Sequence, residues 1–242
     1  NVYYIGNLEM AKVSKEEITF YNLDGEEIQK KMKTVDWDAE AAEKAGYEHF
    51  MMKEIHEQPR AVKDTLNSVL KDGKIDLTDI GLAEEDIRRT SQIYIVACGS
   101  AYHVGMVAQY VIEDLVKIPV RVELASEFRY RKPILDPNGL VIIISQSGET
   151  ADSLAALRET KAQGIRTLGI VNVVGSSIAR EADKVFYTLA GPEISVATTK
   201  AYSTQLMASY ILAIQFAKVK NTITEEQYEN YIAELQAIPE KI

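Results

Sequence analysis

Residues 140–154, LVIIISQSGETADSL, decide the fold, because an apolar run changes abruptly into a segment rich in hydroxyl groups. Residues 140–144 are all apolar, and a run without polar alternation is typical of a strand that is buried on both faces. The polar segment 145–150 follows, and residues 151–163 are rich in Ala, Leu, Glu and Lys, which favour helix. The stretch therefore predicts a buried strand, a polar loop and a helix.

The polar loop has the composition of a phosphate site. The start of a helix leaves backbone N–H groups unpaired and carries a partial positive charge. Hydroxyls at Ser145, Ser147 and Thr150, an amide at Gln146 and the small Gly148 lie beside those groups, which favours phosphate binding. The same residues are also typical of a simple helix cap. The loop has no lysine, so it does not fit the P-loop pattern of nucleotide triphosphatases.

Short apolar segments alternate with helical patterns from residue 93 to about 218. Strands are expected at 93–97, 120–124, 140–144, 167–171 and 184–189. This alternation predicts an α/β fold with three layers (αβα), in which a five-stranded parallel sheet is the middle layer. Ligands of such sheets bind beyond the carboxyl ends of the strands, where the strand order reverses.

The flanking segments are less regular. Residues 2–13 are expected to form a hairpin that turns at Gly6-Asn7, and 18–23 another strand. Residues 37–72 predict helix with a break before Pro59 and a stop at Gly73. Residues 224–227 form a capping box for a last helix that ends at Pro239.

Composition excludes several classes of protein. The 242 residues carry 36 acidic and 27 basic side chains, a net charge of −9, which argues against a nucleic-acid binder. The single cysteine, Cys98, cannot form an internal disulfide and indicates a reducing compartment. There is no signal peptide and no apolar run long enough to span a membrane. We therefore expect a cytoplasmic protein.

Other reactive residues have structural interpretations. His49 and His56 are seven residues apart, too far for the i, i+4 pairing of a helical zinc site, and no metal site is predicted. Cys98 ends a buried strand and is expected to pack rather than to act as a nucleophile. The basic cluster of residues 129–132 is expected to be a solvated or subunit-facing patch, and Glu149 to favour a helix start.

Four motifs together resemble the SIS (sugar isomerase) domain, in particular the first SIS domain of the glucosamine-6-phosphate synthase family, the isomerizing glutamine–fructose-6-phosphate aminotransferases. The motifs are CGSAYH at 98–103, ASEFRYR at 125–131, SQSGET at 145–150 and EISVATTKA at 193–201. The resemblance covers residues 60–220 and implies a flavodoxin-like SIS domain.

The resemblance also implies an organisation in four segments. Residues 1–35 resemble the C-terminal remnant of a glutaminase domain, and 36–90 the helical linker and first SIS helices. Residues 91–220 would form the sugar-phosphate-binding core, and 221–242 a helix that leads to a second SIS domain. The implied function is to bind fructose 6-phosphate or glucosamine 6-phosphate in the isomerase part of an enzyme that makes glucosamine 6-phosphate from fructose 6-phosphate and glutamine. A homodimer through the SIS helices, with no cofactor, is implied as well.

Site residues are carried over from the family's motifs. The implied sugar-phosphate ligands are Ser145, Gln146, Ser147 and Thr150, with Ser100 facing the sugar and Val196 offering its backbone carbonyl. The family often has Thr-Ser where this chain has Ser100-Ala101, so one phosphate-contacting hydroxyl is missing.

No catalytic residue is assigned to this chain. Isomerisation needs a base, an acid and a Schiff-base lysine, which the family takes from the second SIS domain, the C-terminal tail and a neighbouring subunit. Glu193 and Lys200 are expected to serve loop structure and helix packing, and the chain alone is expected to be inactive. Two alternatives stay open: the sugar-sensing module of a transcription regulator, although the first 90 residues show no basic helix-turn-helix, and a stand-alone isomerase.

Overall fold

The structure is a computed structural model that describes residues 2–34 and 43–242. The chain divides into two compact units, Asn1–Glu43 and Lys44–Ile242. The part of the predicted helix that falls on residues 37–42 lies outside the described residues.

The first unit is a small antiparallel sheet. Strand β2 (Ile18–Tyr21) pairs with β1 (Met10–Val13) and with β3 (Glu27–Ile28). The predicted hairpin within residues 2–13 is wrong, because the Gly6 amide donates to the Glu9 carboxylate and the chain turns there without pairing. Val2 instead forms an isolated bridge with Lys33.

The second unit contains the predicted five-stranded sheet, and all its pairings are parallel. The strand order is β10-β9-β8-β6-β7. The strands are β6 (Ile93–Ala97), β7 (Val120–Leu124), β8 (Leu140–Ser145), β9 (Arg166–Val171) and β10 (Lys184–Tyr187). The α/β fold class is confirmed, and the strand bounds differ from the prediction by at most two residues.

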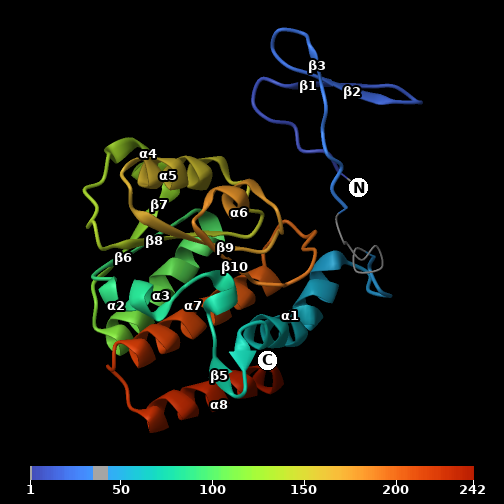
Figure 1. Cartoon of the computed structure of the whole chain (residues 1–242). Coiled ribbons are helices and arrows are strands. Elements are labelled where there is room, and N and C mark those ends of the chain that lie inside the picture. The colour runs from blue at the N-terminus through green and yellow to red at the C-terminus, as the bar shows by residue number, and fades with distance from the viewer. Residues whose placement is uncertain (1, 35–42) are drawn as a thin grey trace. The chain divides into compact units, whose positions relative to one another are not determined.

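Helices cover both faces of this sheet (Figure 1). One face packs against α3 (Gly99–Val116) and α7 (Lys200–Val219), with α1 (Phe50–Asn67) and α8 (Glu225–Lys241) in the same apolar cluster. The other face packs against α4 (Ala125–Arg131), α5 (Ala151–Ala162) and α6 (Ser177–Glu181).

Strand β8 shows why its sequence lacks alternation. Leu140, Ile142 and Ile144 belong to the cluster of the α3 face, whereas Val141 and Ile143 belong to the cluster of the α5 face. Every residue of β8 is buried. Each side chain therefore leaves water whichever way it points, and the whole strand is apolar up to Ser145.

Four predicted boundaries were wrong. Helix α1 begins at Phe50, so the described residues 43–49 of the predicted helix 37–72 are not helical. Helix α1 runs through Pro59 without a break, and the Ile55 carbonyl that Pro59 leaves without its usual amide donor accepts from Gln58 Nε2 at 3.1 Å. Helix α8 likewise continues through Pro239. Gly73 lies in the turn of a short hairpin formed by β4 (Leu70–Lys71) and β5 (Lys74–Ile75).

That hairpin has a turn signal in the sequence. Asp72 and Gly73 have φ of +49° and +75°, which is the backbone that an Asp-Gly dipeptide provides in a two-residue turn. Helices α2 (Glu84–Arg89) and α4 and the 3₁₀ turn Thr78–Ile80 also add to the predicted elements.

The chain reverses its direction across the sheet between β6 and β8. From β6 it crosses over α3 to β7, and from β7 it crosses over α4, on the opposite face, to β8. Ala97 and Ile144 are register partners at the carboxyl ends of β6 and β8. This edge is the position at which open parallel sheets bind their ligands.

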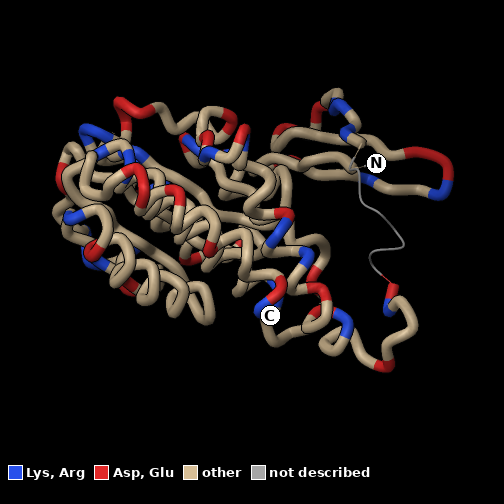
Figure 2. The backbone as a smooth tube through the Cα atoms, turned by 90° about the horizontal axis from the view of Figure 1, so that it is seen from below, with Lys and Arg blue, Asp and Glu red and all other residues tan. Residues whose placement is uncertain are grey.

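The helices and the charged residues bear on whether a membrane or a nucleic acid could be a partner. In the described residues no helix is long and apolar enough to cross a membrane. Figure 2 shows basic and acidic residues interspersed along the backbone rather than a long basic stretch.

Candidate functional site

Two helices begin side by side at the reversal point. Helix α3 starts at Gly99 directly after β6, and α5 starts at Ala151 after the loop that follows β8. The residues before them, Cys98 and Thr150, make no side-chain cap hydrogen bond. The first-turn amides of both helices thus lack side-chain capping at one edge of the sheet, which suits an anion.

The hydroxyl groups of the loop 145–150 form hydrogen bonds with other residues of the same loop. Ser145 Oγ lies 3.0 Å from Thr150 Oγ1 and accepts from the Gly148 amide at 3.1 Å, and it is only 3% exposed. Ser147 Oγ accepts from the Glu149 amide at 3.2 Å. The loop does not cap α5 with a side chain, because Thr150 Oγ1 bonds to Ser145 instead.

Gly148 brings this loop against the start of α6. Its φ is +65°, and a Cβ atom there would lie 2.0 Å from Ser176 Oγ. The Gly148 carbonyl accepts from the Ile178 amide at 3.0 Å, and the Glu149 carboxylate accepts from the Ser177 amide at 2.7 Å. Glu149 therefore sits at a helix start as expected, but it serves α6.

Asn172 joins the polar loop to the segment after β10, although it was not among the predicted site residues. Its amide donates to the Gln146 carbonyl at 3.1 Å. Its side chain donates to the Gly191 carbonyl at 2.8 Å and accepts from the Ala190 amide at 2.8 Å. The sequence position of Asn172 could have indicated this role, since Asn172 is the first polar residue after the buried strand β9.

The other two predicted sugar ligands lie at the same edge on different elements. Ser100 is the second residue of α3 and is exposed, whereas Ala101 packs into the core with 6% exposure. Val196 lies in the loop between β10 and α7, and its side chain is fully exposed. The structure thus brings the residues of the 145–150 loop together and places Ser100 and Val196 on separate segments that follow β6 and β10.

Glu193 and Lys200 have the structural roles that were predicted. Glu193 Oε1 accepts from the Thr199 amide at 2.9 Å and the Ala201 amide at 3.2 Å, and so caps the start of α7. Burial raises the pKa of Glu193, and the two amides oppose that shift. Lys200 is 2% exposed and pairs with Glu57 at 2.6 Å.

The remaining candidates have partners of other kinds. The ring of His56 stacks on Tyr47, with centroids 5.3 Å apart, and Cys98 packs at the edge of the α5-face cluster. Arg129 pairs with Asp152 at 2.6 Å, which raises the pKa of the guanidinium, and Arg131 pairs with Glu123. Within the described ranges no group of three His, Cys, Asp or Glu residues could hold a metal ion.

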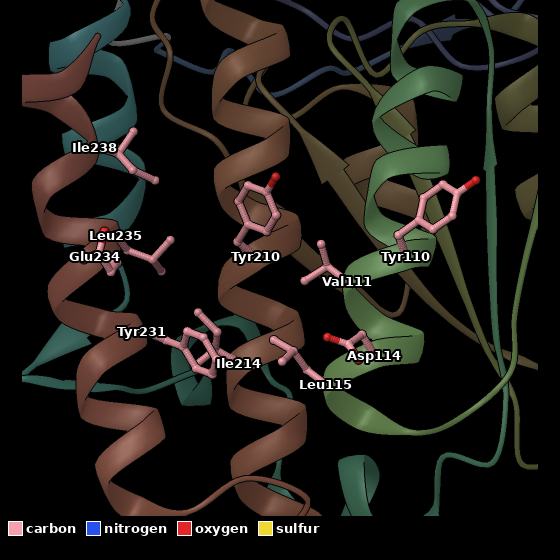
Figure 3. A pocket seen from close by; sticks show the side chains of 10 residues that line it. All are labelled: Tyr110, Val111, Asp114, Leu115, Tyr210, Ile214, Tyr231, Glu234, Leu235 and Ile238. Carbon is pink, nitrogen blue, oxygen red and sulfur yellow. The ribbon is translucent and has the colours of Figure 1, made fainter.

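A hollow of about 700 Å³ lies elsewhere, between α3, α7 and α8 (Figure 3). Apolar and tyrosine side chains line most of it, and Asp114 and Glu234 complete its wall. None of the predicted sugar-phosphate ligands takes part. The lining residues are Tyr110, Val111, Asp114, Leu115, Tyr210, Ile214, Tyr231, Glu234, Leu235 and Ile238.

The sequence of the chain was compared with those of known protein families. Residues 86–215 match the SIS domain family. The chain belongs to the SIS domain family.

Particular relatives are similar over larger parts of the chain. The isomerizing glutamine–fructose-6-phosphate aminotransferase of Clostridium acetobutylicum is 54% identical over all 242 residues. The C-terminal domain of glucosamine-fructose-6-phosphate aminotransferase from Francisella tularensis is 48% identical with a TM-score of 0.79, over 82% of this chain and 56% of that one. Glucosamine-6-phosphate deaminase from Thermotoga maritima is 26% identical with a TM-score of 0.59, over 79% of this chain and 54% of that one. The chain spans about 40% of the length of the curated relatives it matches.

The contact between Gly148 and Ser176 predicts a strong coupling. Gly148→Ala should lower the free energy of unfolding by more than about 2 kcal/mol, through a left-handed backbone and a clash. Adding Ser176→Gly should recover about 1–3 kcal/mol, because it removes the clashing atoms. Urea denaturation of both single variants and the double variant measures this. Ser176→Gly alone should cost a few tenths of a kcal/mol, and additive costs would contradict the close contact.

The pKa of Glu193 predicts a pH-dependent stability. Because burial raises this pKa above the ordinary 4.5, the protonated form stabilises the fold below that value, and the contribution is lost as the pH rises through the folded-state pKa. Glu193→Gln has no such titration. The unfolding free energy of the wild type should therefore fall relative to the variant between about pH 4 and pH 7. If the wild type instead gains on the variant, the amide donors outweigh burial.

Proposed function

We propose that this chain is the fructose 6-phosphate-binding part of the isomerase of an enzyme that makes glucosamine 6-phosphate from fructose 6-phosphate and glutamine. The observation that carries the proposal is the pair of uncapped helix starts beside the SQSGET loop at the reversal point of the sheet. The similarity of the whole chain to about 40% of the length of isomerizing aminotransferases supports it.

The loop after β8 takes the phosphate in this proposal. Ser145, Gln146, Ser147 and Thr150 act with the amides at the start of α5, because hydroxyl and N–H donors together can neutralise a dianion without a lysine. Ser147 and Thr150 are partly exposed and can reach a ligand. The buried Ser145 also orients Thr150 through their contact.

The sugar end meets two other segments. Ser100, exposed at the start of α3, faces the sugar, and the backbone carbonyl of Val196 accepts from a sugar hydroxyl. The absence of a hydroxyl at the buried Ala101 leaves the α3 start with one donor side chain fewer than the family often has. Backbone amides of α3 remain available there.

The chemistry beyond binding depends on residues outside these segments. Residues 1–35 are proposed to end a glutaminase domain, 36–90 to link it to the core at 91–220, and 221–242 to lead to a second SIS domain. The base, acid and lysine of the reaction come from those other parts, and the chain alone binds without turnover. A cytoplasmic location belongs to the proposal, since the single thiol, Cys98, is free.

Self-association through the long helices is also proposed. The hollow between α3, α7 and α8 has tyrosines at its rim, and Tyr110 is 75% exposed. An apolar surface with exposed aromatic rings is typical of a protein interface. A second copy of the chain is the proposed occupant.

Fructose 6-phosphate binding gives the first test. In calorimetric titrations, Ser147→Ala should weaken binding by about 10- to 100-fold, because one charge-assisted hydrogen bond to phosphate is lost. Ser91→Ala is a matched control, since Ser91 precedes β6 at the amino edge and bonds to Asp136. Absence of heat and of a thermal shift with both fructose 6-phosphate and glucosamine 6-phosphate would contradict the proposal. Isomerase turnover by the chain alone would favour a stand-alone isomerase.

Sedimentation equilibrium tests the dimer. The wild type should have twice the chain mass, and Tyr110→Glu should shift it toward the monomer, because a carboxylate would be buried in an apolar interface. Tyr130→Glu is the control, since Tyr130 on α4 is also 75% exposed but lies on the other face of the sheet. Equal effects of both variants, or a monomeric wild type, would reject this interface.

A further inference from the structure

The loop that carries Val196 is not held in place by burial of its apolar side chains. Ile194 is 47% exposed and the Val196 side chain is fully exposed. The loop between β10 and α7 contains no helix or strand that would fix its backbone. Hydrogen bonds therefore matter for its geometry, and three side chains from outside or within the loop bond to its backbone between Ala190 and Ala201.

Two of these side chains hold the ends of the loop. Asn172 binds the backbone of Ala190 and Gly191 at the beginning, and Glu193 binds the amides of Thr199 and Ala201 at the end. Both side chains thus bond to parts of the loop other than the backbone immediately before Val196.

The third side chain, Glu54, holds that middle part. It belongs to α1, 140 residues earlier in the chain than Ile194. Glu54 Oε1 accepts from the Ile194 amide at 2.6 Å and from the Ser195 amide at 3.2 Å, and Oε2 lies 3.3 Å from the same Ser195 amide. The residue is only 1% exposed, so these bonds are shielded from water.

We propose that Glu54 is a positioning residue that sets the sugar-side backbone carbonyl of Val196. By fixing two consecutive amides directly before Val196, one carboxylate determines the orientation of the peptide units that lead to that carbonyl. The inference rests on the proposed function, because it assigns the Val196 carbonyl to the sugar. Glu54 itself does not touch the sugar in this account.

The chemistry of Glu54 fits a positioning role better than a stabilising one. A buried carboxylate is costly to remove from water, and replacing buried charge by apolar groups is often neutral or stabilising. Helix α1 nevertheless presents Glu54 and Glu57 together to the start of α7 and its preceding loop, where Glu57 pairs with Lys200. The carboxylate of Glu54 supplies an acceptor that two adjacent amides can share, which a shorter or apolar side chain cannot do.

The test compares two ligands that occupy different parts of the site. Fructose 6-phosphate spans the phosphate and sugar ends, whereas inorganic phosphate occupies only the phosphate end. Glu54→Ala should weaken fructose 6-phosphate binding by about three- to tenfold, the worth of one neutral hydrogen bond, and change inorganic phosphate binding by less than about twofold. Glu54→Gln keeps one shared acceptor oxygen and should fall between the wild type and Glu54→Ala.

Two further variants calibrate the comparison. Ser147→Ala should weaken both ligands, because it acts on the phosphate end. Asp64→Asn should weaken neither, because Asp64 lies on the same helix in a solvent-exposed pair with Arg60. Equal weakening of both ligands by Glu54→Gln would overturn the positioning role, and so would fructose 6-phosphate binding that Glu54→Ala leaves unchanged.

Amide hydrogen exchange tests the same inference without any ligand. The amides of Ile194 and Ser195 should be protected in the wild type and should exchange faster in Glu54→Gln, while those of Thr199 and Ala201 keep their protection through Glu193. Unchanged protection of Ile194 and Ser195 would overturn the inference. If Glu54→Ala does not fold, Glu54→Gln carries both measurements. If the wild type binds neither ligand, the proposed function fails, and fructose 6-phosphate binding that is insensitive to Glu54 rejects this inference alone.

Discussion

The parallel pairing of β6 with β8 is the constraint on which the candidate site depends. Because Ala97 and Ile144 are register partners, the two chains leave the sheet next to each other. Helix α3 follows β6 onto one face and α5 follows β8 onto the other, and both begin at the same edge because the two parallel strands end there. A one-residue slip of register would also move the apolar side chains of β8 to the wrong clusters, so the core and the site are specified by the same pairing.

The site edge is built mainly from hydrogen bonds rather than from buried surface. The loop after β8 is tied to β9 and α6 through Gln146, Gly148 and Glu149, and Asn172 extends this network to the segment after β10. Such a network leaves partly exposed hydroxyls and amides in fixed places without covering them. A preorganised set of donors loses little freedom when a ligand binds, which is the physical advantage of holding the loop in this way.

Helix α1 lies far from the sheet strands in the sequence but belongs to the same framework. Its residues Glu54, Glu57 and Gln58 bind the loop before α7, Lys200 and Ser203. The start of α7 is thus fixed from α1 as well as from Glu193. Binding residues are often carried by loops that a rigid scaffold holds in place, and here α1 is part of that scaffold.

The sheet, its helices and the polar loop could be predicted because their signals are local. The apolar run 140–144 needs burial on both faces, and the hydroxyls after it need a helix start. The continuous helix through Pro59 could not be predicted in this way, because a proline inside a helical pattern ordinarily indicates a break or a kink. The roles of Asn172 and Glu54 were equally hidden, since each joins segments that only the fold brings together. Ser100 and Val196 lie on different segments, and they were chosen as site residues through the family resemblance alone. That both bind the same sugar is part of the proposed function.

The most direct measurement is a nuclear magnetic resonance titration of the labelled chain with fructose 6-phosphate, followed through its backbone amides. The account predicts the largest shift changes at the start of α3, in the loop after β8 with the start of α5, and at residues 194–196. Inorganic phosphate should reproduce the changes in the loop after β8 and the start of α5 and leave residues 194–196 unaffected. Changes concentrated in the hollow between α3, α7 and α8, or no changes at saturating ligand, would contradict the account.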